Sequence, residues 1–243
     1  MLHKRLRLIA VPVAAVTLPL SVAGFQASAA AAPAPGGKAA TATAPCLADA
    51  TTLLGDLDGD GRRDKISNPG LTGTKVTVQW GTANGSFGPK HAVSALLGAK
   101  KGEVATAAVA DFQRDGKLDL VVNLVTPAGG DDPSTARVAE YRPGPLKRSN
   151  LSSAKSRHSD IGDHGEARQL RIANYGGDAY PDLAILNNSG DGGLDRDVRL
   201  TNPRSGPGKY DYELQVKYGA FGTTSEPPAM PGDGWKHFYK PCS

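Results

Sequence analysis

The sequence predicts a small all-β domain built from repeated antiparallel units, and three observations support this fold class. A loop rich in Asp and Gly occurs three times, each copy between two short apolar segments. Segments with apolar residues at every second position follow these loops, which is typical of strands that bury one face. Glycine and proline are frequent, with 30 and 18 residues, and long apolar helical stripes are missing.

The first 29 residues are predicted to be a secretory signal peptide. Three basic residues lie within the first seven positions, an apolar, charge-free run covers residues 8–25, and Ala27-Ser28-Ala29 supplies a small-residue cleavage motif. A membrane anchor is the alternative, because a run of this length approaches the spanning minimum. Pro12 and Pro19 interrupt the run and favour the cleaved peptide. We therefore expect a protein that is secreted or associated with the cell envelope, with no membrane span after cleavage.

Residues 30–45 are rich in Ala, Pro, Gly and Thr and predict a linker, so that residues 46–243 form one β domain. The formal net charge of the whole chain is +4, and subtracting the three basic residues of the leader leaves +1. A nearly neutral domain lacks the basic footprint of a nucleic-acid-binding protein. We expect no nucleic-acid partner.

Two cysteines, Cys46 and Cys242, lie at the first and next-to-last positions of the predicted domain. In an exported chain such a pair predicts a disulfide, here one that joins the two ends of the domain. Two free thiols are the alternative. The long separation between the cysteines excludes a C-x-x-C redox or zinc motif.

The acidic loop recurs in progressively degenerate form. The first copy, residues 56–64, reads DLDGDGRRD; the second, residues 111–119, reads DFQRDGKLD; and the third, residues 174–182, reads NYGGDAYPD. The copies start 55 and 63 residues apart, and a period of this size indicates a repeated supersecondary unit.

Short apolar or alternating segments surround each loop and predict its strands. The strands expected before the three loops are 51–54, 104–109 and 170–173. Those expected directly after the loops are 65–67, 120–124 and 183–186. Those expected farther along the chain are 76–80, 136–141 and 210–216. Asn84-Gly85 is a strong hairpin signal after the first alternating segment. Each unit is therefore expected to be a small antiparallel sheet whose first connection is the acidic loop.

The segments GDLDGDGRRDKIS, ADFQRDGKLDLVV and ANYGGDAYPDLAI resemble FG-GAP or VCBS repeats, the blade units of integrin α-subunit propellers and of many exported bacterial proteins. The segment from Gly85 to Pro89 also matches the glycine-phenylalanine stretch of that family. The resemblance covers most of residues 50–220 and implies a β-propeller with calcium in its inter-strand loops. Such propellers typically have seven blades, whereas this chain has three copies. We therefore expect a small or partial propeller-like array of about three to four antiparallel blades.

The first loop offers the oxygen donors that calcium prefers. Carboxylates at alternate positions of a tight loop converge, and like charges this close repel one another unless a cation lies between them. The expected ligands are the side chains of Asp56, Asp58, Asp60 and Asp64 with the backbone carbonyl of Arg62. The alternative is a solvated Asp/Gly turn without metal.

The second and third loops are weaker candidates. In the second, the expected ligands are Asp111, Gln113, Asp115, the carbonyl of Lys117 and Asp119. Gln113 replaces an acidic ligand, which lowers the negative charge of this loop and its fit to calcium. The third retains Asn174, Asp178 and Asp182 but lacks an oxygen at position three and the glycine at position six. We expect it to keep its turn without metal.

The leading functional hypothesis is an exported, calcium-stabilised binding or scaffold module, because no catalytic motif such as G-x-S-x-G or H-E-x-x-H occurs. By fold analogy the partner is an extracellular protein or glycan, or a second copy of the chain that covers exposed sheet edges. Two alternatives remain: a hydrolase acting on an extracellular polymer, and a lectin-like glycan binder. Carboxylates opposed in a cleft outside the loops would favour the hydrolase, and a flat apolar or aromatic patch would favour binding.

Overall fold

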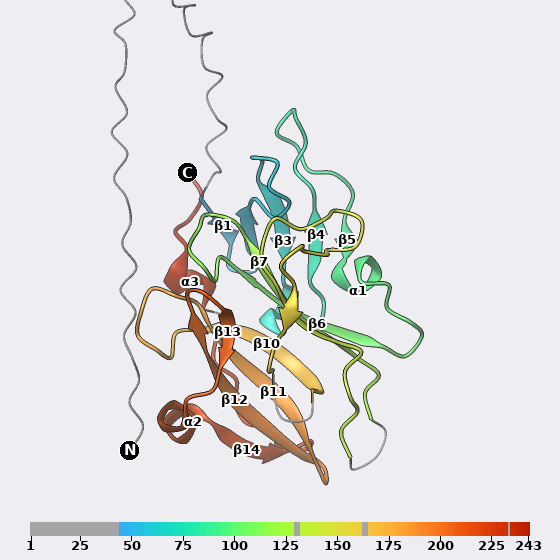
Figure 1. Cartoon of the computed structure of the whole chain (residues 1–243), viewed down its shortest axis with the longest axis vertical. Helices are drawn as coiled ribbons and strands as arrows, with labels where there is room; N and C mark the ends of the chain where they lie inside the picture. The colour runs from blue at the N-terminus through green and yellow to red at the C-terminus, as the bar shows by residue number, and fades with distance from the viewer. Residues whose placement is uncertain (1–43, 129–131, 162–164, 233) are drawn as a thin grey trace, which may run out of the picture. The chain divides into compact units, whose positions relative to one another are not determined.

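The computed structural model of the protein describes residues 44–128, 132–161, 165–232 and 234–243, which all belong to the unit Ala40–Ser243 (Figure 1). The predicted signal peptide and linker residues 30–43 lie outside the described residues. The described part is mostly β and forms three antiparallel, blade-like sheets, as predicted. In these same residues, no helix has the length and apolar character needed to cross a bilayer.

The first sheet has five strands in sequence order and contains the first acidic loop. Leu53 and Ile66 face each other across its second and third strands and are fully buried, whereas the alternating Lys65 is only half-buried. Its strands are β1 (Cys46–Asp49), β2 (Thr52–Gly55), β3 (Asp64–Ser67), β4 (Thr77–Gln79) and β5 (His91–Ala92), with the 3₁₀ turn η1 (Pro69–Leu71) and the helix α1 (Val93–Leu96) beside them. The predicted turn at Asn84-Gly85 is present, with Gly85 at φ 80°.

The second sheet lies in the core of the unit. Its first two strands are apolar along nearly their whole length and buried on both faces, which explains why they show no alternation in the sequence. The strands, in order, are β6 (Val104–Ala110), β7 (Asp119–Val125), β8 (Val138–Arg142) and β9 (Arg157–His158). The strands predicted at residues 104–109, 120–124 and 136–141 are therefore confirmed.

The third sheet has five strands, like the first. Its order is β10 (Ala167–Ala173), β11 (Asp182–Gly190), β12 (Gly193–Asn202) and β13 (Gly206–Lys209), and β14 (Ala220–Thr223) pairs with the other end of β12. A tight turn with Asp191 and Gly192 at positive φ joins β11 to β12. The long β12 therefore takes the place of the outer strand that the sequence predicted farther along the chain (Figure 1).

The prediction of a strand at residues 210–216 is wrong, because most of this segment lies in the helix α2 (Tyr212–Tyr218). Asp211 is its N-cap and accepts a hydrogen bond from the backbone N–H of Leu214 at 3.1 Å. Glu213 in the first turn and Lys217 in the last turn suit the helix dipole. Apolar residues alternate along this segment as they do in a strand that buries one face. None of the helix residues is buried, however, so the alternation does not mark a face that packs against a sheet.

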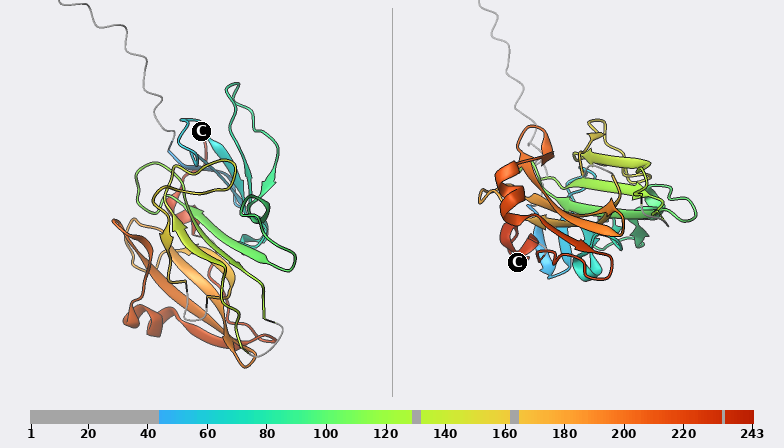
Figure 2. Two further views of the ribbon diagram at one scale, coloured as in Figure 1. Left: turned by 45° about the vertical axis from the view of Figure 1, so that its right-hand side comes forward. Right: turned by 90° about the horizontal axis from the view of Figure 1, so that it is seen from below.

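A segment of the first sheet inserts between the other two sheets. The N–H of Ala107 on β6 donates to the carbonyl of Gly73 at 2.9 Å, and the N–H of Leu170 on β10 donates to Thr72 at 3.2 Å. β6 and β10 run beside each other near this point (Figure 2). Gly73 has φ 78°, and a Cβ there would lie 2.7 Å from the Ala107 carbonyl oxygen. The close approach of three backbones therefore requires glycine at this position.

The end of the chain returns to the first strand. Cys46 and Cys242 form a disulfide with their Cα atoms 5.0 Å apart, as predicted. The N–H of Leu47 donates to the carbonyl of Lys240, and the N–H of Cys242 donates to the carbonyl of Leu47, both at 2.8 Å. The short helix α3 (Trp235–Phe238) precedes this contact, and the buried Trp235 indole donates to the carbonyl of Val109 on β6 at 2.8 Å. The C-terminal segment thus fastens the first sheet to the second.

Candidate metal site in the first acidic loop

The three acidic loops occupy equivalent places in the three sheets. They join β2 to β3, β6 to β7 and β10 to β11, which are the first hairpins of the repeated units. In each hairpin the residue before the loop pairs with position nine of the loop: Gly55 with Asp64, Ala110 with Asp119, and Ala173 with Asp182. The loops can therefore be compared position by position.

Two positions are identical in all three copies, and both accept backbone hydrogen bonds. Position nine is a buried Asp that accepts one N–H from loop position two and another from a residue on or just after the strand that follows the hairpin. The donors are Leu57 and Gly81 for Asp64, Phe112 and Gly144 for Asp119, and Tyr175 and Thr201 for Asp182, at 2.8–3.1 Å. This carboxylate therefore ties the loop to the strand that follows the hairpin, which is β4, β8 or β12.

Position five has the same local role in each copy. Its Oδ1 accepts the N–H of position seven at 2.8–3.0 Å, which closes the turn. The pairs are Asp60 with Arg62, Asp115 with Lys117, and Asp178 with Tyr180. Sequence reasoning assigned positions five and nine to metal binding and missed these backbone contacts. Their identity in all three copies, including the degenerate third, was the available signal.

Burial perturbs the ionisation of the position-nine carboxyls. It raises the pKa of Asp64 to about 6 and the pKa of Asp119 to about 7, and the backbone hydrogen bonds only partly oppose this effect. Burial raises the pKa of Asp182 as well. A divalent cation beside such a group would favour its ionised form.

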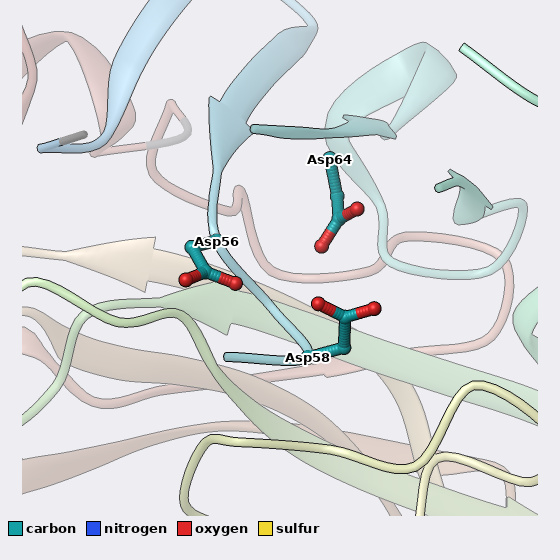
Figure 3. A group of neighbouring side chains, drawn as sticks. All are labelled: Asp56, Asp58 and Asp64. Atoms are coloured by element: carbon teal, nitrogen blue, oxygen red, sulfur yellow. The ribbon is translucent and has the colours of Figure 1, made fainter. Parts of the chain in front are cut away.

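Three carboxylates converge in the first loop. Asp56, Asp58 and Asp64 each place one oxygen within 4.8 Å of the others, and their side chains point toward one another (Figure 3). Asp56 and Asp64 are buried, and the Asp58 side chain is 6% exposed. In the residues that the structure describes, this is the one group of three or more Asp, Glu, His or Cys side chains with this spacing.

The donor set fits a hard divalent cation. All three groups are carboxylates, and each oxygen that accepts a single backbone N–H keeps a second lone pair for a metal. Calcium takes six to eight oxygens, so backbone carbonyls and water would have to complete the shell. The carbonyl of Arg62 remains a predicted ligand.

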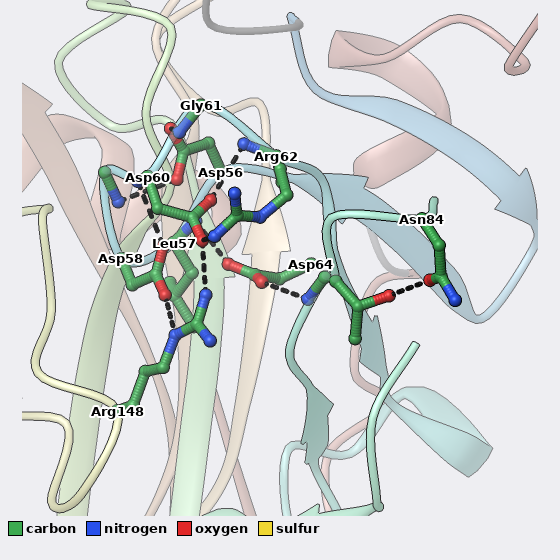
Figure 4. Close-up of polar contacts among 12 residues, drawn as sticks. Asp56, Leu57, Asp58, Asp60, Gly61, Arg62, Asp64, Asn84 and Arg148 are labelled. Atoms are coloured by element: carbon green, nitrogen blue, oxygen red, sulfur yellow. Dashed lines mark hydrogen bonds and ion pairs between the residues drawn. The ribbon is translucent and has the colours of Figure 1, made fainter. Parts of the chain in front are cut away.

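Asp60 lies outside this group of three. Its Oδ2 pairs with the guanidinium groups of Arg62 and Arg148, and Arg148 also pairs with Asp58 (Figure 4). Asp60 as a metal ligand therefore stays a prediction. Sequence reasoning missed Arg148, which comes from the connection between β8 and β9 and has no local sequence signal.

The second loop does not gather its acidic side chains in the same way. Asp111 accepts the N–H groups of Asp115 and Gly116, both at 2.9 Å. Asp115 lies 3.5 Å from the Lys117 ammonium, and the Gln113 amide donates to the carbonyl of Pro203 at 3.3 Å. Gln113 thus contacts another segment, and the proposed metal ligands of this loop, including the Lys117 carbonyl and Asp119, remain predictions.

The third loop keeps the turn and lacks the acidic group. Asn174 at position one contacts the ring of His237, with Nδ2 and Nε2 2.7 Å apart. Position three is Gly176, so it offers no side-chain oxygen. Asp182 accepts three backbone N–H groups, from Tyr175, Gly176 and Thr201. Asp178 and Asp182 therefore both accept backbone hydrogen bonds within this loop, and a turn without metal remains the prediction for it.

Comparison with protein families identifies a repeat in this chain. The model of the FG-GAP-like repeat family matches residues 56–122, from the first Asp of the first loop into β7. No curated protein and no solved structure matches the chain. The matched segment contains the group of three carboxylates and the whole second loop. Residues 56–122 of this chain are therefore an FG-GAP-like repeat.

Proposed function

We propose that the protein is an exported, calcium-stabilised binding or scaffold module, and that its first acidic loop binds calcium. The observation that carries this proposal is the convergence of Asp56, Asp58 and Asp64 within the FG-GAP-like repeat. An all-oxygen donor set favours calcium over zinc, which prefers nitrogen and sulfur ligands.

The disulfide supports the exported location. Bonds such as Cys46–Cys242 persist in oxidising compartments outside the cytoplasm. Its position supports a scaffold role, because it joins the first strand to the C-terminal segment that contacts β6. The extracellular partner, a protein or a glycan, would bind to surfaces that this frame holds in place.

The metal would stabilise the folded state by binding to the first acidic loop, which forms the corner between β2 and β3. Asp64 links this corner to the end of β4 through the N–H of Gly81, and burial disfavours its charge. A bound cation would offset this cost in the folded state only. A ligand present at a hundred times its dissociation constant stabilises the folded state by about 2.7 kcal/mol.

The test is thermal unfolding of the full chain in excess calcium and in excess chelator. We expect calcium to raise the melting temperature of the wild type, and Asp58→Asn to abolish this increase. Asp178→Asn is the matched control, because Asp178 occupies position five of the third loop and lies outside the acidic group. An unchanged melting temperature in chelator, or an Asp58→Asn variant that responds like the wild type, would contradict the proposal.

A second candidate function rests on a polar pocket outside the three loops. The pocket, of about 450 Å³, is lined by Asp160, Asp195, Asp197, Arg199, Tyr210 and Gln215. Arg199 is buried beneath it, with Nη2 3.9 Å from Asp160 and 3.8 Å from Asp197, and its guanidinium lies under the Tyr210 ring. Carboxylates with an aromatic ring suit a hydroxyl-rich ligand and favour the glycan-binding and hydrolase alternatives.

A glycan screen with the wild type and Asp195→Asn tests this second candidate. A glycan binder retains its ligand unchanged, whereas a hydrolase releases new reducing ends from it. Either activity should weaken in the Asp195→Asn variant. If no glycan binds in the presence or absence of calcium, the second candidate is wrong.

A further inference from the structure

One cation in the first acidic loop comes from another sheet. Arg148 lies between β8 and β9 of the second sheet, and its Nε donates to Oδ2 of Asp58 while its Nη2 donates to Oδ2 of Asp60 (Figure 4). Arg62 from the loop itself also reaches Oδ2 of Asp60. The guanidinium of Arg148 therefore bridges two carboxylates that the sequence predicts as metal ligands.

Packing holds the Arg148 segment against the loop. The N–H of Leu146 donates to the carbonyl of Leu57 at 2.8 Å, and the Leu146 side chain is buried. The Pro145 ring lies so close to Gly59 that a Cβ there would come within 2.7 Å of it. The Arg148 guanidinium also lies 5.6 Å from the centre of the Trp80 ring. The contact is thus part of the interface between the two sheets.

The two carboxylates have no oxygen that is free of a partner. The Oδ1 atoms of Asp58 and Asp60 accept the N–H groups of Asp60 and Arg62, at 3.1 and 2.9 Å, and the Oδ2 atoms face Arg148. A divalent cation bound to Asp58 would repel a guanidinium at this distance and compete with it for Oδ2. Arg148 stays charged, because a guanidinium is not deprotonated in proteins.

We propose that Arg148 is an internal counter-ion of the first loop, which neutralises Asp58 and Asp60 without metal and is displaced when calcium binds. The connection between β8 and β9 then sets the calcium affinity of a loop in the neighbouring sheet. This inference rests on the proposed function of the loop. Asp56 and Asp64, which do not pair with Arg148, would provide the first oxygens for the incoming metal.

The test compares Arg148→Gln with Lys147→Gln in the full chain. Lys147 is the adjacent cation and lines the same pocket beside the loop. Its backbone forms local hydrogen bonds, in which its N–H donates to the carbonyl of Ser152 and its carbonyl accepts the N–H of Leu151, both backbone contacts that Lys147→Gln retains. Calcium affinity is measured by titration calorimetry after chelator treatment, and the melting temperature is measured in chelator and in saturating calcium.

We expect Arg148→Gln to bind calcium roughly tenfold more tightly than the wild type, while Lys147→Gln changes the affinity by less than about twofold. In chelator, Arg148→Gln should melt below Lys147→Gln, and saturating calcium should remove this difference. Equal affinities of the two variants, or weaker binding by Arg148→Gln, would overturn the displacement.

The experiment separates this inference from the proposed function. If neither the wild type nor either variant binds calcium, the proposed function and the displacement both fail. In that case a lower melting temperature of Arg148→Gln in chelator would still support the counter-ion role. Equal melting temperatures of the two variants in chelator would overturn the counter-ion role as well.

Discussion

The first and third acidic loops share the same hairpin geometry but differ in the carboxylates that they bring together. Both keep Asp at positions five and nine, where the carboxylates accept backbone hydrogen bonds. The first loop adds Asp56 and Asp58 and forms a group of three carboxylates, whereas the third has Asn174 and Gly176 at these positions. The comparison indicates that positions five and nine hold the turn, and that positions one and three provide the acidic group.

Removal of position nine should have the largest effect and should be similar in both loops. Asp64→Ala leaves two buried N–H groups without their acceptor, and Asp182→Ala leaves one buried and two part-buried N–H groups without theirs. We expect each variant to lose about 3 kcal/mol of unfolding free energy. Denaturant unfolding in chelator measures this loss. A much smaller loss in Asp182→Ala would show that the third loop does not need its position nine.

The third loop should gain a calcium response when positions one and three are made acidic. A Cβ at Gly176 would lie 3.5 Å from Oδ2 of Asp182 and 3.6 Å from Oδ2 of Asp178, so a side chain fits there and points into the loop. We expect the double variant Asn174→Asp, Gly176→Asp to lose about 1–2 kcal/mol in chelator through repulsion between carboxylates. Calcium should restore this loss.

Thermal unfolding of the double variant with and without calcium measures the gain. Asn174→Asp, Gly176→Asn is the control, because it changes the same positions with one carboxylate fewer. A double variant that melts alike in calcium and chelator would contradict the separation of turn positions from metal positions.

The stability of the metal-free protein should fall as the pH rises from about 4 to about 7. Burial raises the pKa of Asp64 to about 6 and that of Asp119 to about 7 in the folded state, above the value of an unfolded Asp. The folded state therefore binds more protons in this range, and the stabilisation present at low pH is lost as the pH rises through the folded-state pKa values. Melting temperatures in chelator across this range check the slope. A stability that rises with pH would contradict it.

The smallest effect should come from the exposed ion pair in the second loop. Lys117 and Asp115 lie 3.5 Å apart, and their side chains are 37% and 45% exposed. We expect Lys117→Gln to change the unfolding free energy by less than about 0.5 kcal/mol. Denaturant unfolding checks this value, and a loss comparable to that of Asp64→Ala would show that local pairing holds this loop.

The hairpins around the loops could be predicted because their signals are local. The apolar segments before and after each loop became β2 and β3, β6 and β7, and β10 and β11. The segment 210–216 failed because its alternation competes with a helix cap at Asp211, and only tertiary burial could have decided between them.

The acidic group could be predicted in part. The spacing of Asp56, Asp58 and Asp64 is a local property of one tight loop, and the structure brings these three together. Asp60 turns toward Arg148, which lies 88 residues farther along the chain, and no local pattern encodes that contact. The ion pairs between the two sheets are therefore the part of the site that could not be predicted from the sequence.

A crystal structure of the protein grown in calcium tests the comparison of the two loops most directly. We predict an ion bound by Asp56, Asp58 and Asp64 at about 2.3–2.6 Å, and no ion between Asp178 and Asp182. An empty first loop at saturating calcium would contradict the conclusion that its acidic group binds metal. An ion in the third loop would contradict the conclusion that positions five and nine alone hold the turn and do not bind metal.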